Sequence, residues 1–149
     1  PENCSTEFIG SILETYKEQG ILFDLVIVDY LDLMKCDEKA WSEQDEQGKI
    51  ARALKSLSMK WYVPVWSPTQ ANIKSEDASR FVLGDMGYSQ KKNHVADMVI
   101  GLLLTEEDKQ NMDTMTLQIC KWRDGKKDVF VKLYPDMDRM RVHIEDIKE

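Results

Sequence analysis

Hydrophobic residues recur along this chain with two different spacings, which predict helices and strands in alternation. Over 5–19 they return every three or four positions, Ser5 or Thr6 can cap a helix there, and Gly20 can end it. The same spacing predicts a second helix over about 46–60. The predicted apolar faces consist of Phe8, Ile9, Ile12, Leu13 and Tyr16 in the first helix and Ile50, Ala53, Leu54 and Leu57 in the second.

A compact apolar run follows each of these predicted helices. Residues 22–34 contain the unbroken run Val26 to Val28, and a short run at 63–66 follows the second helix. A run without alternation is typical of a strand that is buried on both faces, as in a parallel sheet covered by helices. The order helix, strand, helix, strand therefore predicts an α/β fold with a mostly parallel sheet flanked by helices.

The rest of the chain changes character after a long polar stretch. Residues 67–93 are poor in strand signals, and such a stretch inside a compact domain is usually functional or mobile. A third buried strand is predicted at 98–104. Two apolar segments, 114–122 and 128–134, flank an Asp-Gly pair, which predicts a C-terminal β-hairpin. An alternating segment at 140–144 closes the chain.

Length and charge narrow the class of protein. The 149 residues have room for one domain, so we expect 1–149 to form a single domain. Twenty basic and 27 acidic residues give a net charge of −7, which argues against a general nucleic-acid coat but allows a local basic groove. Three cysteines without close spacing indicate free thiols in a reducing compartment. Since no membrane span or secretory leader is evident, we expect a cytoplasmic protein with no membrane partner.

Asp29 is the first candidate for chemistry. It ends the segment VIVD, and the carboxyl end of a buried strand is where α/β sheets bind their ligands. In nucleotide-hydrolysing folds an aspartate at this position holds Mg²⁺, usually through water, because a hard cation needs oxygen ligands. The alternative is a strand-end aspartate that only caps a loop.

Gln70 and the pair Lys121 and Arg123 are further candidates. Gln70 follows the apolar run at 63–66, where a neutral amide can bond to a γ-phosphate or to an attacking water. Lys121 and Arg123 alternate on one predicted strand before the Asp-Gly turn, so both cations share a face and can reach a phosphate on another subunit. A solvated glutamine and a solvated hairpin end are the alternatives.

The polar stretch also carries basic residues, namely Lys74, Arg80, Lys91 and Lys92. If the stretch lines a channel, these residues would contact a phosphate backbone. Acidic residues lie among them, so a solvated surface is an equally good interpretation of the charge pattern alone.

Taken in order, these features resemble one family, the hexameric replicative DNA helicases of the DnaB type and their phage relatives. The Asp-Tyr-Leu after the first apolar strand and the Lys-x-Arg before a glycine turn are its most specific parts, and the resemblance covers nearly the whole chain. The matching segments are FDLVIVDYLDLM (23–34), ARALKSLSMKW with VPVWSPTQAN (51–72), DMGYSQKKNHVADMVIGLL (85–103) and CKWRDG (120–125).

The resemblance implies a RecA-like motor fold that hydrolyses ATP with Mg²⁺ while it translocates on single-stranded DNA. Asp29 would hold the Mg²⁺, and Gln70 would be the phosphate sensor. Lys121 and Arg123 would act in trans on ATP held by the neighbouring subunit of a homo-hexamer. A primase and a helicase loader are partners that the family suggests.

The resemblance also implies that the loop from Asp85 to Lys92, with Ser89, faces the central channel and grips DNA through its phosphates. The chain departs from the family here, because Gly87 and Tyr88 precede Ser89 where Arg-Glu is common. We therefore expect Lys91 or Lys92 to take over the contact, alongside the other basic residues of the polar stretch.

A larger departure is that no GxxxxGK[ST] phosphate loop occurs in the 149 residues. We therefore expect the chain to be the C-terminal part of a longer motor domain, inactive alone, with the phosphate loop encoded upstream. Two alternative interpretations remain. One is another RecA-like ATPase, such as a recombinase or a clock-type ATPase, and the other is a nucleotide-free binding module that kept the fold.

Overall fold

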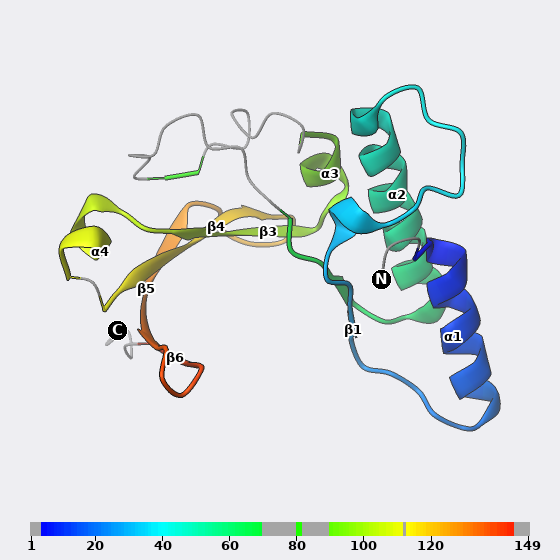
Figure 1. Ribbon diagram of the computed structural model, residues 1–149, viewed down its shortest axis with the longest axis horizontal. Coiled ribbons are helices and arrows are strands. Elements are labelled where there is room, and N and C mark those ends of the chain that lie inside the picture. Colours follow the sequence, from blue (N-terminus) through cyan, green and yellow to red (C-terminus); the bar gives the residue numbers. More distant parts are fainter. Residues whose placement is uncertain (1–3, 70–79, 82–89, 112, 145–149) are drawn as a thin grey trace. The chain divides into compact units, whose positions relative to one another are not determined.

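The chain forms two compact units, each with its own β-sheet (Figure 1). The computed structural model describes residues 4–69, 80–81, 90–111 and 113–144. Of these, the first unit contains 4–69 and 90–96, and the second contains 80–81, 97–111 and 113–144.

Two capped helices dominate the first unit. Helix α1 spans Thr6–Glu18, with Ser5 as its N-cap and Gly20 in the left-handed region (φ +78°) just beyond its end, as predicted. Helix α2 spans Glu43–Trp61. It begins three residues earlier than predicted because the hydroxyl of Ser42 accepts a hydrogen bond from a backbone N–H of the first turn.

A short parallel sheet joins the segments that follow the two helices. Strand β1 (Val26–Ile27) pairs in parallel with strand β2 (Val65–Trp66), which confirms the predicted βαβ connection. Val26 packs against the core, but Ile27 is 68% exposed, so burial of this run on both faces was a wrong prediction. Successive side chains of a strand point to opposite faces, and in the described structure the core packs against only one face of this sheet. Val26 therefore faces the core and Ile27 faces away from it.

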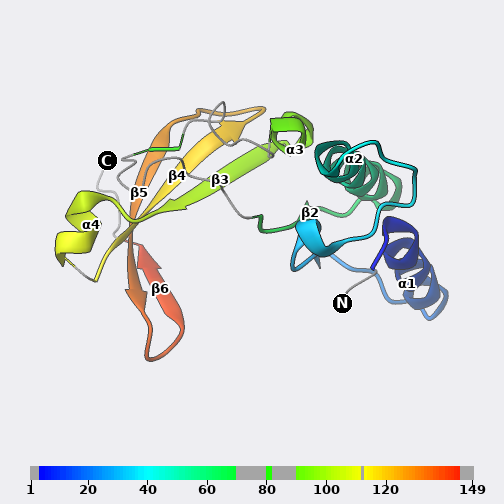
Figure 2. The same ribbon diagram turned by 45° about the horizontal axis from the view of Figure 1, so that its top comes forward.

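The core of the first unit lies between α1, α2 and the sheet, and the two helices lie side by side (Figures 1 and 2). A single turn of 3₁₀ helix, η1 (Leu31–Leu33), and the short helix α3 (Gln90–Val95) complete the unit. Only part of the predicted α1 face is buried, since Phe8, Ile12 and Tyr16 are exposed. The buried apolar side chains are Ile9, Leu13, Leu31, Met34, Ile50, Ala51, Leu54 and Leu57.

The second unit is a four-stranded antiparallel sheet in the order β3-β4-β5-β6 (Figure 2). The predicted hairpin is confirmed, with a second hairpin after it, and the short helix α4 connects β3 to β4. The elements are β3 (Met98–Leu103), α4 (Glu106–Asn111), β4 (Met115–Trp122), β5 (Val129–Asp136) and β6 (Arg141–Ile144).

The prediction of a mostly parallel sheet is therefore wrong for the described residues, although the α/β class holds. The segment predicted as a third buried strand, 98–104, does form a strand, β3, which pairs antiparallel with β4 and does not join the parallel pair. Turns of a few residues permit only antiparallel neighbours for β4, β5 and β6, whereas β3 reaches β4 through α4 and its pairing is not set by a short turn. No helix in the described part of the chain is long and apolar enough to cross a membrane.

Gln118 on β4 is a buried polar residue that organises the second unit. Its side chain is fully buried, and its Oε1 accepts a hydrogen bond from the backbone N–H of Phe81 at 2.6 Å. Its Nε2 donates to the backbone oxygen of Phe81 and to the carboxylate of Asp128, both at 3.1 Å. The Phe81 ring lies on Gly101 of β3, where an added Cβ would come within 2.0 Å of the ring. One amide thus holds Phe81 to the sheet.

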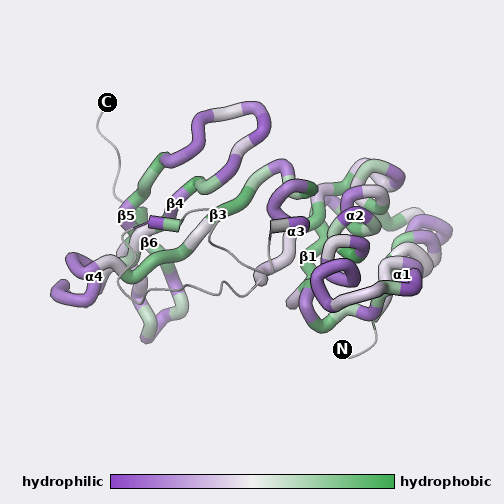
Figure 3. The backbone as a smooth tube through the Cα atoms, turned by 90° about the horizontal axis from the view of Figure 1, so that it is seen from above, coloured by the Kyte–Doolittle hydropathy of each residue, from purple (hydrophilic) through white to green (hydrophobic). Residues whose placement is uncertain are grey.

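Asp108 is the second buried polar centre of this unit. It belongs to helix α4, which is hydrophilic along its length (Figure 3). Its side chain is 1% exposed and pairs with Lys132 at 2.7 Å. It also accepts hydrogen bonds from the hydroxyls of Thr105, Thr114 and Thr116. Burial by itself raises the pKa of Asp108, but the hydrogen bonds from Lys132 and the threonines outweigh it and hold that pKa far below its usual value.

Replacing Gln118 by leucine should destabilise the chain by about 2–3 kcal/mol, because the backbone groups of Phe81 would lose their buried partners. The matched control is Gln47→Leu, on a buried glutamine whose Oε1 has no hydrogen-bond partner among the described residues. We expect this control to be neutral or stabilising. Urea unfolding of both variants measures the difference, and equal losses in the two would contradict the role given to Gln118.

Asp108→Asn should destabilise the chain by roughly 2–4 kcal/mol at pH 7, because it leaves Lys132 without its buried carboxylate. The pKa of Asp108 is lower in the folded state than its unfolded value of about 3.9, so the ionised carboxylate stabilises the fold above about pH 4. This contribution is lost as the pH falls toward about 2, so the difference from wild type should shrink.

Urea unfolding at pH 7, 5 and 3 tests this dependence. Asp113→Asn, at an exposed position shortly after α4, serves as the control and should follow wild type throughout. A penalty for Asp108→Asn that stays constant across the three pH values would be inconsistent with the explanation.

Candidate functional site

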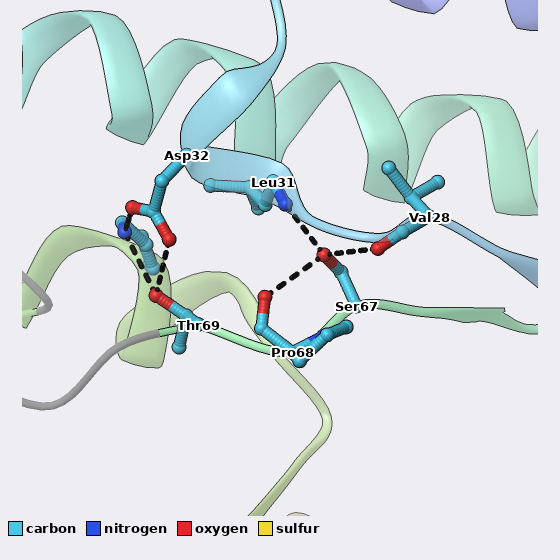
Figure 4. Close-up of polar contacts among 7 residues, drawn as sticks. Val28, Leu31, Asp32, Ser67, Pro68 and Thr69 are labelled. Carbon is cyan, nitrogen blue, oxygen red and sulfur yellow. Dashed lines mark hydrogen bonds and ion pairs between the residues drawn. The ribbon is translucent and has the colours of Figure 1, made fainter. Parts of the chain in front are cut away.

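The carboxyl ends of β1 and β2 lie side by side because the two strands are parallel. This edge is where α/β sheets bind their ligands. Asp29 follows β1 by two residues, and Ser67 directly follows β2. The close-up in Figure 4 shows the side chains and backbone groups that connect the two segments.

Ser67 joins the two strand ends. Its hydroxyl donates a hydrogen bond to the backbone oxygen of Val28 and accepts one from the backbone N–H of Leu31, both at 2.8 Å (Figure 4). The N–H of Val28 also donates to the backbone oxygen of Trp66 at 2.9 Å. A serine can fill this position because one hydroxyl both donates and accepts. The backbone is therefore held on both sides of Asp29.

Asp29 presents an exposed carboxylate at this edge. It is joined to Tyr30 by a cis peptide bond, and the carboxylate has no hydrogen-bond or ion-pair partner among the described residues. A carboxylate with its oxygens available fits Mg²⁺, which prefers oxygen ligands. The described part of the chain contains no group of three or more acidic, histidine or cysteine side chains that could hold a metal. A Mg²⁺ bound here would therefore take most of its ligands from water and phosphate.

Asp32, which follows Asp29 by three residues, forms a polar cluster with Thr69 and Lys92. One oxygen of the Asp32 carboxylate accepts a hydrogen bond from the Thr69 hydroxyl at 2.8 Å, and the other accepts one from the Lys92 ammonium (Figure 4). The same ammonium lies 3.0 Å from the Thr69 hydroxyl. Sequence reasoning missed Asp32, Ser67 and Thr69, because no spacing in a single sequence distinguishes these polar residues from others in loops.

A pocket of about 300 Å³ lies beside β1 and η1, with Asp29 and Tyr30 in its lining. The rest of the lining is almost entirely apolar and comes from α1 and from the 23–34 segment. Such a lining offers few hydrogen-bond donors to phosphate groups, so the carboxylate edge rather than this pocket is the candidate site for phosphate chemistry.

Lys121 and Arg123 lie at the end of β4 in the second unit. The Arg123 side chain is about half exposed and pairs with the Asp97 carboxylate at 2.6 Å, while its backbone N–H bonds to the backbone oxygen of Asp97. Burial and the nearby Arg123 charge lower the pKa of Lys121, which the Asp97 carboxylate partly opposes. The two cations are therefore close enough for the charge of Arg123 to act on Lys121, while their shared role stays a prediction. Trp122 packs over the turn where an added Cβ on Gly125 would come within 2.2 Å of the indole.

The structure separates the predicted DNA-binding residues by their surroundings. Gln70, Lys74 and Ser89 lie outside the described residues. Arg80 is exposed, and the Lys91 side chain is 51% exposed with its ammonium 3.7 Å from the Asp45 carboxylate. Lys92, by contrast, is 7% exposed and bound within its cluster, so its burial argues against a contact with DNA.

The comparisons with known proteins bear on the family and the fold. The family model for the DnaB-like helicase C terminal domain matches residues 2–141. The replicative DNA helicase DnaB of Pasteurella multocida is 30% identical over 125 residues, which cover 80% of this chain and 27% of that protein. This chain spans about a quarter of the length of the curated relatives that it matches.

Two solved structures share the fold. One is a DnaB-like replicative helicase studied with its interactions with primase, with a TM-score of 0.76 at 23% identity over 91% of this chain and 34% of that one. The other is an ATPase domain, with a TM-score of 0.80 at 22% identity over 94% of this chain and 51% of that one. The chain thus belongs to the family of DnaB-like helicase C-terminal domains and is part of a DnaB-like replicative helicase ATPase domain.

Proposed function

We propose that this chain contributes the Mg²⁺ aspartate, the phosphate sensor and the trans-acting cations of an ATP-driven motor that translocates on single-stranded DNA. The observation that supports this most directly is the exposed Asp29 carboxylate at the carboxyl edge of the parallel pair, joined through Ser67 to the segment that leads to Gln70. The 149 residues contain no phosphate loop. In this proposal the phosphate loop is supplied by another part of a longer helicase.

Asp29 holds Mg²⁺ in this proposal, directly or through water, and bound Mg²⁺ neutralises charge on the phosphates of ATP. The hydrogen bonds on both sides of Asp29 fix its backbone, so the carboxylate stays at the edge of the sheet without having to reorganise. Gln70 follows directly on Thr69, whose hydroxyl is fixed by Asp32, and its amide contacts the terminal phosphate or the attacking water.

Arg123 and Lys121 act on ATP that the neighbouring subunit of a homo-hexamer holds. The pair between Arg123 and Asp97 is about half exposed on both sides, and such pairs contribute only about 0–1 kcal/mol. Arg123 can therefore exchange the carboxylate for a phosphate at little cost. An arginine that stabilises the transition state in this way is worth about 10³–10⁵ in rate.

Exposed cations contact single-stranded DNA through its phosphates. Arg80 and Lys91 are the described residues that fit this role, and Lys74 and Ser89 belong to the same proposal from the sequence. Lys92 is left out because its ammonium is buried with Asp32. We extend a primase partner from the DnaB-like helicase structure to the longer protein, and a helicase loader remains a prediction.

The 149-residue chain alone should hydrolyse no ATP, because the backbone N–H groups and the lysine of a phosphate loop are missing from its sequence. Phosphate release by the purified chain, with and without single-stranded DNA, measures this. Steady turnover that purifies together with the chain and is lost in Asp29→Asn would show that the chain carries a complete site of its own.

In the longer helicase, Arg123→Ala should lower kcat for ATP by about 10³-fold or more with little change in nucleotide binding. Lys126→Ala, in the same exposed turn, is the matched control and should keep turnover within about twofold. Turnover of Arg123→Ala within tenfold of wild type would contradict the role of Arg123 as a finger.

Mixed hexamers test whether Arg123 acts in trans. Arg123→Ala subunits and Asp29→Asn subunits should each be inactive alone. After mixing, some interfaces pair an intact Asp29 with an intact Arg123 from the neighbour, so turnover should return. If Arg123 acted within its own subunit, no mixture would recover activity.

A further inference from the structure

The Asp32–Thr69–Lys92 cluster brings together three segments of the first unit that are distant in sequence. Asp32 belongs to η1, three residues after Asp29, and Thr69 lies between β2 and Gln70. Lys92 lies on α3, whose contacts are with α2. The Lys92 ammonium therefore connects three parts of the unit: the segment after Asp29, the segment before Gln70, and helix α3.

The three groups satisfy one another almost completely. Thr69 donates its hydroxyl proton to Asp32 and accepts a hydrogen bond from Lys92, while the Asp32 carboxylate receives both partners on different oxygens. Lys92 is 7% exposed and the Asp32 side chain 19% exposed, while Thr69 lies at the surface, so water has little access to the ion pair between Lys92 and Asp32. Moving Thr69 away would leave a buried ammonium and a partly buried carboxylate each short of a partner, which is unfavourable.

Helix α3 carries a second lysine with the opposite environment. Lys91 precedes Lys92, and successive residues of an α-helix project about 100° apart, so Lys91 reaches the surface while Lys92 points inward. The helix lies tightly on α2, since a Cβ added to Gly48 would come within 3.1 Å of Lys91 Cβ. Because both lysines belong to the same short helix packed against α2, a displacement of Lys91 would also displace Lys92.

We propose that Lys92 is a positioning residue that couples DNA contact to ATP hydrolysis within one subunit. Phosphates of single-stranded DNA bind the exposed cation Lys91 on α3, Lys92 on the same helix holds the Thr69 hydroxyl, and Thr69 directly precedes the proposed sensor Gln70 in the sequence. Asp32 fixes the same ammonium relative to the loop that carries Asp29. The inference rests on the proposed function, because it gives DNA contact and phosphate sensing to those residues.

The test measures ATP turnover of the longer helicase as a function of single-stranded DNA concentration for Lys92→Met and Lys91→Met. Lys92→Met keeps most of the buried stem but loses the ammonium, so maximal stimulation by DNA should fall at least fivefold. The DNA concentration for half-maximal stimulation should stay within about twofold. Lys91→Met should show the reverse, with a half-maximal DNA concentration raised at least threefold and nearly full stimulation at saturating DNA.

Two further variants separate positioning from stability. Ile50→Val removes one methyl group from the core of the same unit without touching the cluster, and should leave DNA stimulation unchanged even if it lowers Tm. Asp32→Asn keeps the side-chain shape and removes the charge that holds Lys92, so it should reduce maximal stimulation as Lys92→Met does. If Lys92→Met misfolds, Asp32→Asn alone decides the matter.

Unchanged maximal stimulation in Lys92→Met or Asp32→Asn would overturn the inference, as would an equal loss in Ile50→Val. A wild-type helicase whose ATP turnover did not respond to single-stranded DNA would instead remove the proposed function, and the coupling with it. The two failures are distinguishable because the first appears only in the variants.

Discussion

The parallel pairing of β1 with β2 is the constraint on which the candidate site of the first unit depends. Its register places Val26 opposite Val65, so both strands end at the same edge and the loops after them begin side by side. Only in this register does Ser67 reach Val28 and Leu31 with one hydroxyl. A shift by one residue would turn Val26 out of the core and separate these partners, so core packing and site geometry have the same cause.

Buried polar side chains fix the irregular segments of both units, where regular backbone bonds end. Gln118 holds Phe81 to the antiparallel sheet, Asp108 holds helix α4 over the strand that follows it, and Lys92 holds α3 beside the parallel pair. Each is a buried group with at least one partner in a loop or turn, namely Phe81, Thr114 and Thr69. Such groups specify one arrangement, because any other arrangement leaves a buried donor, acceptor or charge unsatisfied.

Much of the fold could be predicted from local patterns, because those patterns are set by neighbouring residues. The capped helix α1, the run at Val26 and the hairpin at Asp124-Gly125 all follow from periodicity and turn chemistry. The pairing of β3 could not be predicted in this way, because an apolar strand reads the same beside a parallel or an antiparallel neighbour. The choice is made by partners distant in the sequence.

Some residues of the candidate site could be predicted from local patterns, and others could not. Asp29 and the pair Lys121 and Arg123 stand out because each lies at a strand end or on one face of a strand, which spacing reveals. Lys91 and Lys92 cannot be told apart by composition, since both are lysines in one polar stretch.

The different environments of these two lysines bear on how an acidic chain contacts DNA. With a net charge of −7, the chain as a whole repels a phosphate backbone, so binding depends on a few exposed cations. Lys92 is not one of these exposed cations, because its ammonium is buried in an ion pair with Asp32. Among the described residues the other lysine pairs with Asp45 at 3.7 Å, a contact weak enough to exchange for a phosphate. One helix therefore presents an exposed cation on one side and a fixed internal charge on the other, which is the arrangement that the proposed coupling between two sites requires.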